Sequence, residues 1–329
     1  MRIIKTSILV IFITAALCGC AEKQPAAPIS ETRLLLDTVC TITMYEPYDR
    51  GLVSEALDMC EEYEALFSRT VTGSDVWRIN NAGGAPVEVH PDTLELIGIG
   101  LEYCALSDGL FDITIGRLTS LWDFGGDGHV PAASDIEAAL KTIDYRQITI
   151  AGNTVQLKDP GAALDLGGVA KGYIAEKLAS FLKERGTKGA VIDLGGNVVA
   201  VGEKPDGSAW NIGVEDPFGS GGEIVGIIST GQASIVTSGI YERQFVRDGR
   251  SYHHILDPTT GMPAESGIVS ATVVTESSAV GDAFSTIPIL LGHEKTMALV
   301  EQVPELMGLI IILEDGELIK YGDIDYREI

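Results

Sequence analysis

The sequence predicts one α+β domain, because segments with helical spacing of apolar residues are interspersed with runs of hairpins rather than alternating strictly with single strands. Its 329 residues, 45% of them hydrophobic, are enough for a sizeable core and too apolar for a disordered chain. No long linker divides the chain after residue 31. We therefore expect a single compact domain over residues 32–329, with mixed or antiparallel sheets and flanking helices.

Periodicity and turn residues place the elements of this domain along the chain. In order, we expect a strand at 32–45, helices at 52–67, 94–107 and 134–142, a hairpin at 147–157, a helix at 169–185, strands at 190–201, 210–214, 224–229, 234–237 and 268–274, a helix at 279–291 and a hairpin at 309–321. His90-Pro91-Asp92 is expected to open the second helix. The third helix has Ser134 and, three residues later, Glu137, which is the spacing of a capping box.

The N-terminus has the features of an export signal. A basic start precedes an apolar run over residues 8–17, which is too short for a comfortable membrane span. The run ends in Leu17-Cys18-Gly19-Cys20, which resembles the acylation motif of bacterial lipoproteins. We expect a lipoprotein signal peptide over residues 1–19, acylation of Cys20 and a tether over residues 20–31. The protein would then be exported and lipid-anchored to the outer face of the cytoplasmic membrane; a plain secretory signal cut elsewhere is the alternative.

Charge and cysteine content exclude several classes of function. The formal net charge of −24 creates a field that repels phosphate backbones, so nucleic acid is not an expected partner. An anionic substrate would need a bound cation or a locally basic pocket. Cys40, Cys60 and Cys104 are an odd number without close spacing, which predicts neither a disulfide framework nor a zinc site. Cys60 and Cys104 lie in apolar periodic stretches and are expected to be buried.

The sharpest local signal is the segment Asp165–Gly172, in which a strand leads through two glycines into a helix with Lys171 in its first turn. A helix N-terminus collects free N–H groups and partial positive charge, so phosphate is its natural ligand. The segment lacks the spacing of a Walker A loop. The alternative is an ordinary strand-to-helix turn with a solvated lysine.

Asp282 and Thr286 form a second signal, because residues four apart share one helix face. A carboxylate and a hydroxyl suit a hard cation such as Mg²⁺. The alternative is an N-capping aspartate with a core-facing threonine. A third signal is the pair His253-His254: adjacent strand residues point to opposite faces, so they are not a ready metal pair, and one is expected to be functional and the other structural. No G-x-S-x-G elbow is present, which disfavours serine hydrolase chemistry.

Taken in order, seven stretches of the chain resemble the ApbE family, the FAD:protein FMN transferases. They are SDGLFDITIGRLTSLWDFG, LDLGGVAKGYIAEKLA, AVIDLGGNV, WNIGVEDP, VTSGIYERQF, YHHILDPTTGMPA and SATVVTESSAVGDAFSTIPILLG. The resemblance implies an enzyme that splits FAD at its pyrophosphate and joins FMN to a Thr or Ser hydroxyl of a target protein, releasing AMP. It further implies that the target is a flavin subunit of a membrane redox complex. Family members are commonly exported lipoproteins, in agreement with the N-terminus.

The resemblance also implies which residues bind FAD, which bind Mg²⁺ and which acts as the base. The residues expected to contact FAD are Leu36, Thr70, Leu110, Phe111, Asp112, Asp165, Lys171 and Leu256. The expected Mg²⁺ ligands are Asp282, Thr286 and the backbone carbonyl of Gly168, and His254 is the candidate base or hydroxyl-orienting group. The chain departs from the family pattern where Asp37 replaces a glycine, where Thr70 replaces a tyrosine of the flavin pocket, and at Pro288 within the metal-binding helix.

Two alternative functions use the same residues. The first is an FAD pyrophosphatase, in which water replaces the acceptor hydroxyl and free FMN and AMP are released. The second is a lipoprotein that binds flavin without catalysis and needs no divalent cation.

Overall fold

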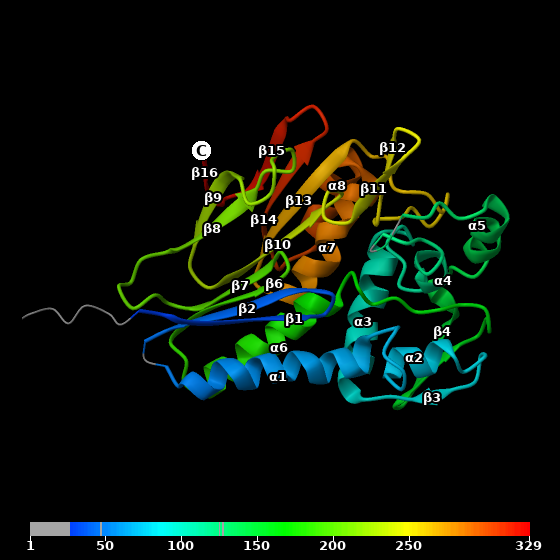
Figure 1. Ribbon diagram of the computed structural model, residues 1–329, viewed down its shortest axis with the longest axis horizontal. Coiled ribbons are helices and arrows are strands. Elements are labelled where there is room, and N and C mark those ends of the chain that lie inside the picture. Colours follow the sequence, from blue (N-terminus) through cyan, green and yellow to red (C-terminus); the bar gives the residue numbers. More distant parts are fainter. Residues whose placement is uncertain (1–26, 47, 125, 127) are drawn as a thin grey trace, which may run out of the picture.

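The computed structural model describes residues 27–46, 48–124, 126 and 128–329, whose course is shown in Figure 1. The strands are β1 (Ile29–Leu35), β2 (Thr38–Tyr45), β3 (Val87–Glu88), β4 (Ile148–Ala151), β5 (Thr154–Leu157), β6 (Gly189–Leu194), β7 (Asn197–Gly202), β8 (Trp210–Glu215), β9 (Ile224–Thr230), β10 (Ala233–Gly239), β11 (Gln244–Arg247), β12 (Arg250–His253), β13 (Ile268–Thr275), β14 (Leu306–Leu313), β15 (Leu318–Gly322) and β16 (Asp325–Glu328). The helices are α1 (Arg50–Phe67), α2 (Asp75–Asn80), α3 (Pro91–Leu106), α4 (Gly116–Thr119), α5 (Ala133–Leu140), α6 (Ala170–Glu184), α7 (Ser278–Leu291) and α8 (His293–Leu299), with 3₁₀ turns η1 (Tyr145–Gln147) and η2 (Val300–Gln302).

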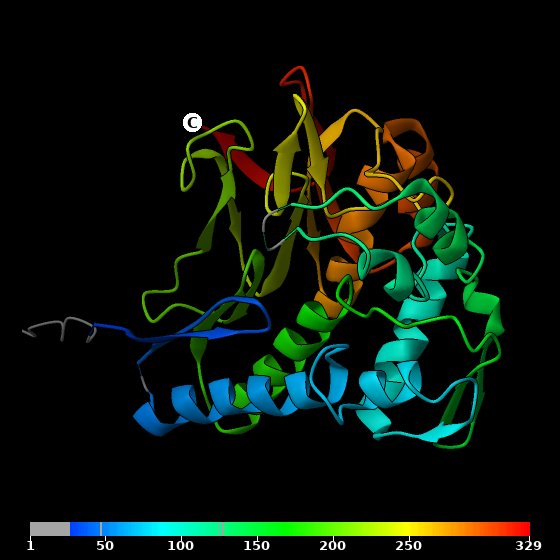
Figure 2. The same ribbon diagram turned by 45° about the vertical axis from the view of Figure 1, so that its right-hand side comes forward.

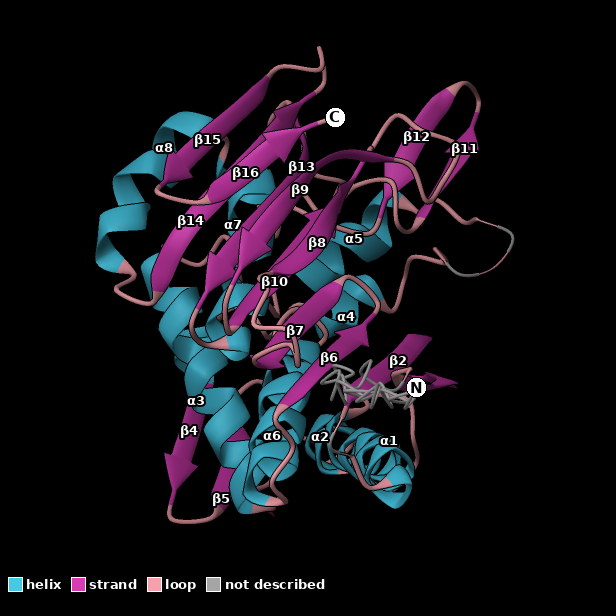
Figure 3. Cartoon of the chain, turned by 90° about the vertical axis from the view of Figure 1, so that its left-hand side faces the viewer, coloured by secondary structure: helices cyan, strands magenta, loops and turns pink. Residues whose placement is uncertain are grey.

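An antiparallel sheet in the order β1-β2-β6-β7-β10-β13-β14-β15 forms the centre of the molecule. Helices α1, α6 and α7 cover one face of this sheet, and their apolar sides bury the main core against it (Figures 1 and 2). On the other face, a smaller sheet in the order β16-β9-β8 covers β10, β13 and β14 (Figure 3). Because β13 is covered on both faces, every one of its residues is buried.

Two small sheets lie apart from this sandwich. One has the order β3-β5-β4, and the other is the hairpin β11-β12. The hairpin is held by a cluster of four aromatic rings, in which Phe245 and Tyr252 stack at 5.3 Å between ring centroids and both approach Trp122. Phe124 completes the cluster by stacking on Trp122. The cluster fixes the hairpin next to the segment that leads into α5.

The α+β class and the single domain are confirmed, and so are the long helices. Helices α1, α3, α6 and α7 agree with the predicted ranges to within a few residues. His90 caps α3 as expected, since its Nδ1 atom accepts a hydrogen bond from the Asp92 N–H at 3.2 Å. The three cysteines in the described part of the chain, Cys40, Cys60 and Cys104, are free and buried.

Three local predictions are wrong. The strand expected at 32–45 is two strands, β1 and β2, which turn at Leu36-Asp37; both residues adopt φ of 56°, so a left-handed turn forms without glycine. The strand expected at 190–201 is likewise two strands, β6 and β7, joined at Gly195-Gly196. The capping box at Ser134 does not form, because α5 begins one residue earlier and Ala132 occupies the cap without a side-chain hydrogen bond.

None of the helices among the described residues has the length and apolar character needed to cross a bilayer. The expected signal peptide, Cys20 and most of the expected tether lie outside the described residues.

Candidate active site

The two strongest sequence signals meet where α7 crosses the N-terminus of α6. Asp282 of α7 is 3% exposed, and its Oδ2 atom accepts a hydrogen bond from the backbone N–H of Gly172 at 2.8 Å. Its Oδ1 atom lies 3.8 Å from Nζ of Lys171. No side chain caps α6, so the carboxylate of Asp282 takes that place from another helix. A buried anion, an ammonium group and a helix N-terminus are therefore gathered at one point.

This crossing depends on the absence of a side chain at Gly172. A Cβ atom there would lie 2.6 Å from the Cβ of Asp282 and would overlap the carbonyl oxygen of Ser278. Replacing Gly172 with alanine is therefore expected to push α6 away from α7 and to lower the free energy of unfolding by about 1–3 kcal/mol. Denaturant unfolding measures this change.

Gly98 provides the matched control, because it also lies within a helix, α3, and a Cβ atom there would meet nothing within 4 Å. Gly98→Ala is expected to raise the stability by up to about 1 kcal/mol through helix propensity. Equal effects of the two substitutions would contradict the steric role assigned to Gly172.

Thr286 lies on the same face of α7 as Asp282, as its spacing predicts. The Thr286 hydroxyl is 3.3 Å from the hydroxyl of Ser238 in β10. The Ser238 hydroxyl also lies 2.8 Å from the hydroxyl of Ser285. The alternative that Asp282 is an N-cap is wrong, because α7 begins at Ser278 and Ser277 is its cap. Asp282 and Thr286 thus present a carboxylate and a hydroxyl, both oxygen donors, beside the start of α6.

The glycine turn before α6 meets the loop that follows α3. A Cβ atom at Gly168 would lie 2.9 Å from Cε2 of Phe111, so the buried ring lies directly against this glycine. Leu110, the preceding residue, is half-buried. Asp112 is 7% exposed and accepts hydrogen bonds from the Thr114 N–H at 2.8 Å and the Tyr145 N–H at 3.0 Å. Burial raises the pKa of the Asp112 carboxyl, while these hydrogen bonds lower it. The carboxylate of Asp112 thus fixes the loop.

Asp165 joins three segments at the other side of the glycine turn. Its carboxylate accepts a hydrogen bond from the Thr119 hydroxyl at 2.8 Å and from the Gly167 N–H at 3.0 Å, and lies 3.3 Å from Nε of Arg69. Thr70 follows Arg69 and is exposed, with its hydroxyl 3.1 Å from that of Ser68. The structure therefore brings the loop that contains Thr70 next to Asp165.

Leu36 and Leu256, the remaining residues expected to contact FAD, lie on two separate turns. Leu36 is half-buried in the β1-β2 turn, which is held by a hydrogen bond from the Arg243 guanidinium to the Asp37 carbonyl at 3.0 Å. Leu256 is 4% exposed, and its side chain lies in a separate buried cluster that includes Leu118 and Trp122. Leu256 can therefore offer a ligand its backbone rather than its side chain.

The two adjacent histidines have different surroundings. Nε2 of His253 lies 3.0 Å from the Ala264 carbonyl in the protein interior, and its buried Nδ1 atom, like that of His254, has no hydrogen-bond partner among the described residues. The His254 N–H donates to the Arg243 carbonyl at 3.1 Å, and its buried Nδ1 atom has no hydrogen-bond partner among the described residues. Burial, together with the positive charges of Arg243 and Lys171 and with His253, lowers the pKa of His254 to about 4. Its imidazole is therefore neutral near pH 7 and can accept a proton.

Sequence reasoning missed several residues around this point. Burial raises the pKa of the Glu242 carboxyl to about 7. The positive charges of Lys171 and Arg243 lower this pKa, and the carboxylate of Asp282 raises it further. The Glu242-Arg243 pair was visible in the sequence, but nothing there placed it beside Lys171. Arg69 also gave no signal, because its partner Asp165 is remote in the sequence.

A glycine turn, an ammonium group and the positive end of a helix dipole are groups with which a protein can hold a phosphorylated ligand. The chain belongs to the ApbE family, whose model matches residues 36–310. The FAD:protein FMN transferase of Treponema pallidum is 33% identical over 95% of this chain and 93% of its own length. The crystal structure of the ApbE protein from Thermotoga maritima superimposes with a TM-score of 0.82 at 32% identity, covering 89% of this chain and 97% of that one. The flavin transferase ApbE of Vibrio cholerae gives 0.79 at 29% identity, covering 90% and 97%.

Proposed function

We propose that this protein is an FAD:protein FMN transferase whose chemistry takes place where α7 crosses the start of α6. The oxygen of a Thr or Ser hydroxyl on the acceptor attacks the phosphorus of the FMN half. The bond from that phosphorus to the bridging oxygen breaks, AMP leaves, and the proton of the hydroxyl passes to a base. The observation that supports this proposal is the meeting of Asp282, Lys171 and the α6 N-terminus. Relatives that carry this enzyme name match over nine-tenths or more of the chain.

The charges of the site suit a pyrophosphate. In a chain with a net charge of −24, Lys171 and the positive end of the α6 dipole supply local positive potential. A protein catalyses phosphoryl transfer mainly by positioning the reacting groups and by compensating the negative charge of the phosphates. The glycine turn before α6 and the Phe111 loop would place the flavin half, with Leu36, Thr70, Leu110, Asp165 and Leu256 around it. Asp112 would contribute by holding its loop in place.

A divalent cation fits the remaining groups. Asp282, Thr286 and the Gly168 carbonyl offer oxygen donors, the kind that Mg²⁺ prefers, and no group of three or more His, Cys, Asp or Glu suited to a metal occurs in the described part of the chain. The Oδ1 atom of Asp282 pairs with Nζ of Lys171 at 3.8 Å, so a cation bound there would share this carboxylate with the lysine. Bound there, Mg²⁺ would compensate the negative charge of the pyrophosphate.

His254 is the proposed proton acceptor. The low pKa of its imidazole keeps the ring neutral, and Arg243 holds the backbone of His254 in place. A neutral imidazole beside Lys171 can take the proton of the acceptor hydroxyl as the phosphoester forms.

The pH dependence of kcat/KM tests the role of His254 as the base. Because only the neutral imidazole accepts a proton, kcat/KM is expected to stay constant from about pH 7 to about pH 5 and to fall as the pH drops through about 4. An ordinary histidine would lose activity near pH 6.5. Initial rates with FAD, measured alongside circular dichroism to confirm folding, test this expectation. A midpoint near 6.5 that disappears in His254→Ala would contradict the lowered pKa of His254, and a midpoint that persists in this variant would show that His254 is not the titrating base.

The decisive experiment incubates the protein with FAD, Mg²⁺ and an acceptor domain that carries the target threonine, and then measures the acceptor mass and released AMP. We expect the acceptor to gain one FMN phosphoester and AMP to appear in equal amount. An unmodified acceptor with free FMN would instead indicate an FAD pyrophosphatase. Bound FAD without turnover in Mg²⁺ would indicate a flavin-binding lipoprotein.

We further propose that the acceptor is a flavin subunit of a membrane redox complex and that this enzyme acts beside it, exported and anchored by a lipid on Cys20. Cys20→Ser is expected to release the protein from membranes and to leave the rate of FMN transfer unchanged, because no proposed site residue belongs to the tether. Fractionation of cells followed by immunoblotting and an activity assay measures both. Persistent membrane association of the variant would mean that the uncleaved apolar segment is the anchor.

A further inference from the structure

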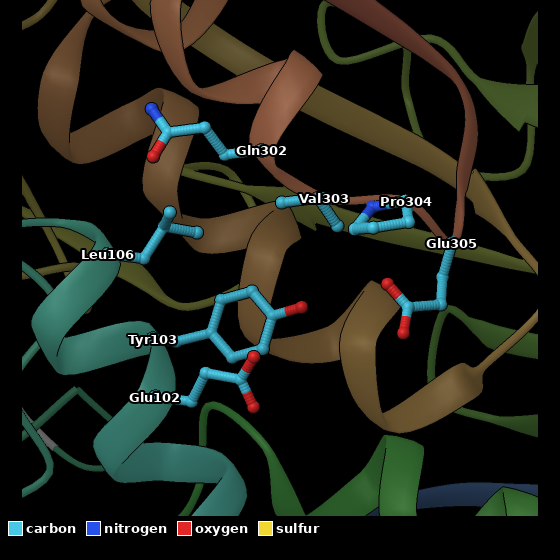
Figure 4. Close-up of a pocket in the computed structure, with 7 residues that line it drawn as sticks. All are labelled: Glu102, Tyr103, Leu106, Gln302, Val303, Pro304 and Glu305. Atoms are coloured by element: carbon cyan, nitrogen blue, oxygen red, sulfur yellow. The ribbon is translucent and has the colours of Figure 1, made fainter.

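A pocket of about 190 Å³ lies between the end of α3 and the segment that precedes β14, apart from every residue assigned above to flavin or metal. Glu102, Tyr103 and Leu106 line it from α3, and Val303, Pro304 and Glu305 line it from the opposite side (Figure 4). The second wall is fixed in place, because the Glu305 carbonyl accepts hydrogen bonds from the Thr275 hydroxyl at 3.0 Å and from the Glu276 N–H at 3.2 Å.

Tyr103 points its hydroxyl into this pocket. The residue is 4% exposed, and Figure 4 shows the hydroxyl directed toward the space between Pro304 and Glu305. No described residue forms a hydrogen bond with that hydroxyl, which opens onto the pocket and is not one of the fully buried polar atoms that lack a partner. A ligand in the pocket would supply one.

The pocket is acidic. Glu102 and Glu305 extend toward the Tyr103 ring from the two walls, and neither carboxylate forms an ion pair within the described part of the chain (Figure 4). Burial and the charges of both glutamates raise the pKa of Tyr103, so the phenol stays protonated. Two uncompensated carboxylates and a neutral hydroxyl attract a cation that can also donate hydrogen bonds.

The rest of the lining decides the kind of cation. Leu106, Val303 and Pro304 provide an apolar surface that a bare metal ion does not use. A cavity of about 150 Å³ can hold a molecule of the size of benzene, and this pocket is slightly larger. We propose that the pocket binds a small organic ammonium ion, with its charged head between Glu102 and Glu305 and its hydrocarbon body on the apolar wall.

Titration of the full chain by calorimetry with three probes of one shape tests the ligand class. Benzylammonium, benzyl alcohol and benzoate differ only in charge and polar group. Benzylammonium is expected to bind at least about tenfold more tightly than benzyl alcohol, since hydrogen bonds to charged groups are the stronger ones, and benzoate is expected not to bind. Equal affinity for the alcohol, or displacement of the amine by an equivalent of Ca²⁺, would overturn the proposal.

Two variants test the residues. Glu102→Gln combined with Glu305→Gln is expected to weaken benzylammonium binding at least about tenfold, whereas Glu301→Gln, an exposed neighbour that does not line the pocket, should leave it unchanged. Tyr103→Phe is expected to weaken binding several-fold while the melting temperature stays the same, because the hydroxyl faces the pocket and makes no hydrogen bond to another described residue. Tight binding to both variants, or equal weakening by Glu301→Gln, would overturn the assignment.

Discussion

Asp282→Ala is expected to reduce FMN transfer by at least about 10²-fold, the cost of removing one preorganised charge-stabilising group. The substitution deletes the carboxylate that accepts the Gly172 N–H and leaves this N–H and Lys171 without that partner. The pyrophosphate then meets a site without its proposed cation. Mass spectrometry of the acceptor and quantification of AMP measure the loss.

A matched control separates this effect from a loss of structure. Asp325 in β16 is an exposed aspartate outside the site, and Asp325→Ala should transfer FMN at the wild-type rate. Melting curves should show that both variants are folded at the assay temperature. Wild-type transfer by a folded Asp282→Ala protein would remove Asp282 from the proposed metal site.

His254→Ala is expected to lower the transfer rate by roughly 10²–10⁴-fold, the usual contribution of a general base. The affinity for FAD should change much less, because the groups proposed to hold the phosphates and the flavin lie on other segments. Stopped assays at saturating FAD give kcat, and equilibrium titration of FAD gives the dissociation constant. The fall in activity near pH 4 should be absent from the residual rate of this variant.

His253 is the internal control for this substitution. Its ring contacts the Ala264 carbonyl and is 6% exposed, so His253→Ala should lower stability rather than the rate of chemistry. If His253→Ala were inactive and His254→Ala active, the two roles would have to be exchanged. If both transferred FMN normally, an acidic side chain such as Glu242 would become the candidate base.

The long helices could be predicted because each repeats apolar residues at helical spacing over three or more turns, as the buried residues of α1 and α6 show. The turn at Leu36-Asp37 could not be predicted from the sequence. A left-handed turn usually contains glycine or asparagine, and this one begins with a leucine. The hairpin β11-β12 was also missed. Its position depends on rings from a distant segment, Trp122 and Phe124, and not on local alternation.

The site could be predicted in pieces but not in its arrangement. Asp165–Gly172 and Asp282 each carry a local physical signal, the first as a glycine turn before a helix and the second as an i, i+4 pair with Thr286. Nothing in their spacing indicates that Asp282 of α7 accepts a hydrogen bond from the N–H of Gly172 at the start of α6. The resemblance to the ApbE family placed both segments in one site.

The bonds that complete this site join segments far apart in the sequence. The contact between Gly172 and Asp282 spans 110 residues, and the one between Arg243 and Asp37 spans 206. Closing such long loops costs chain entropy before their contacts form, which slows folding. A chain that lacks the last third of its length, including α7, has no Asp282 to place against α6. A ligand that binds only the assembled site would also draw the folding equilibrium toward the native state. The amount of FAD that binds at the proposed site would therefore report how much of the chain has folded.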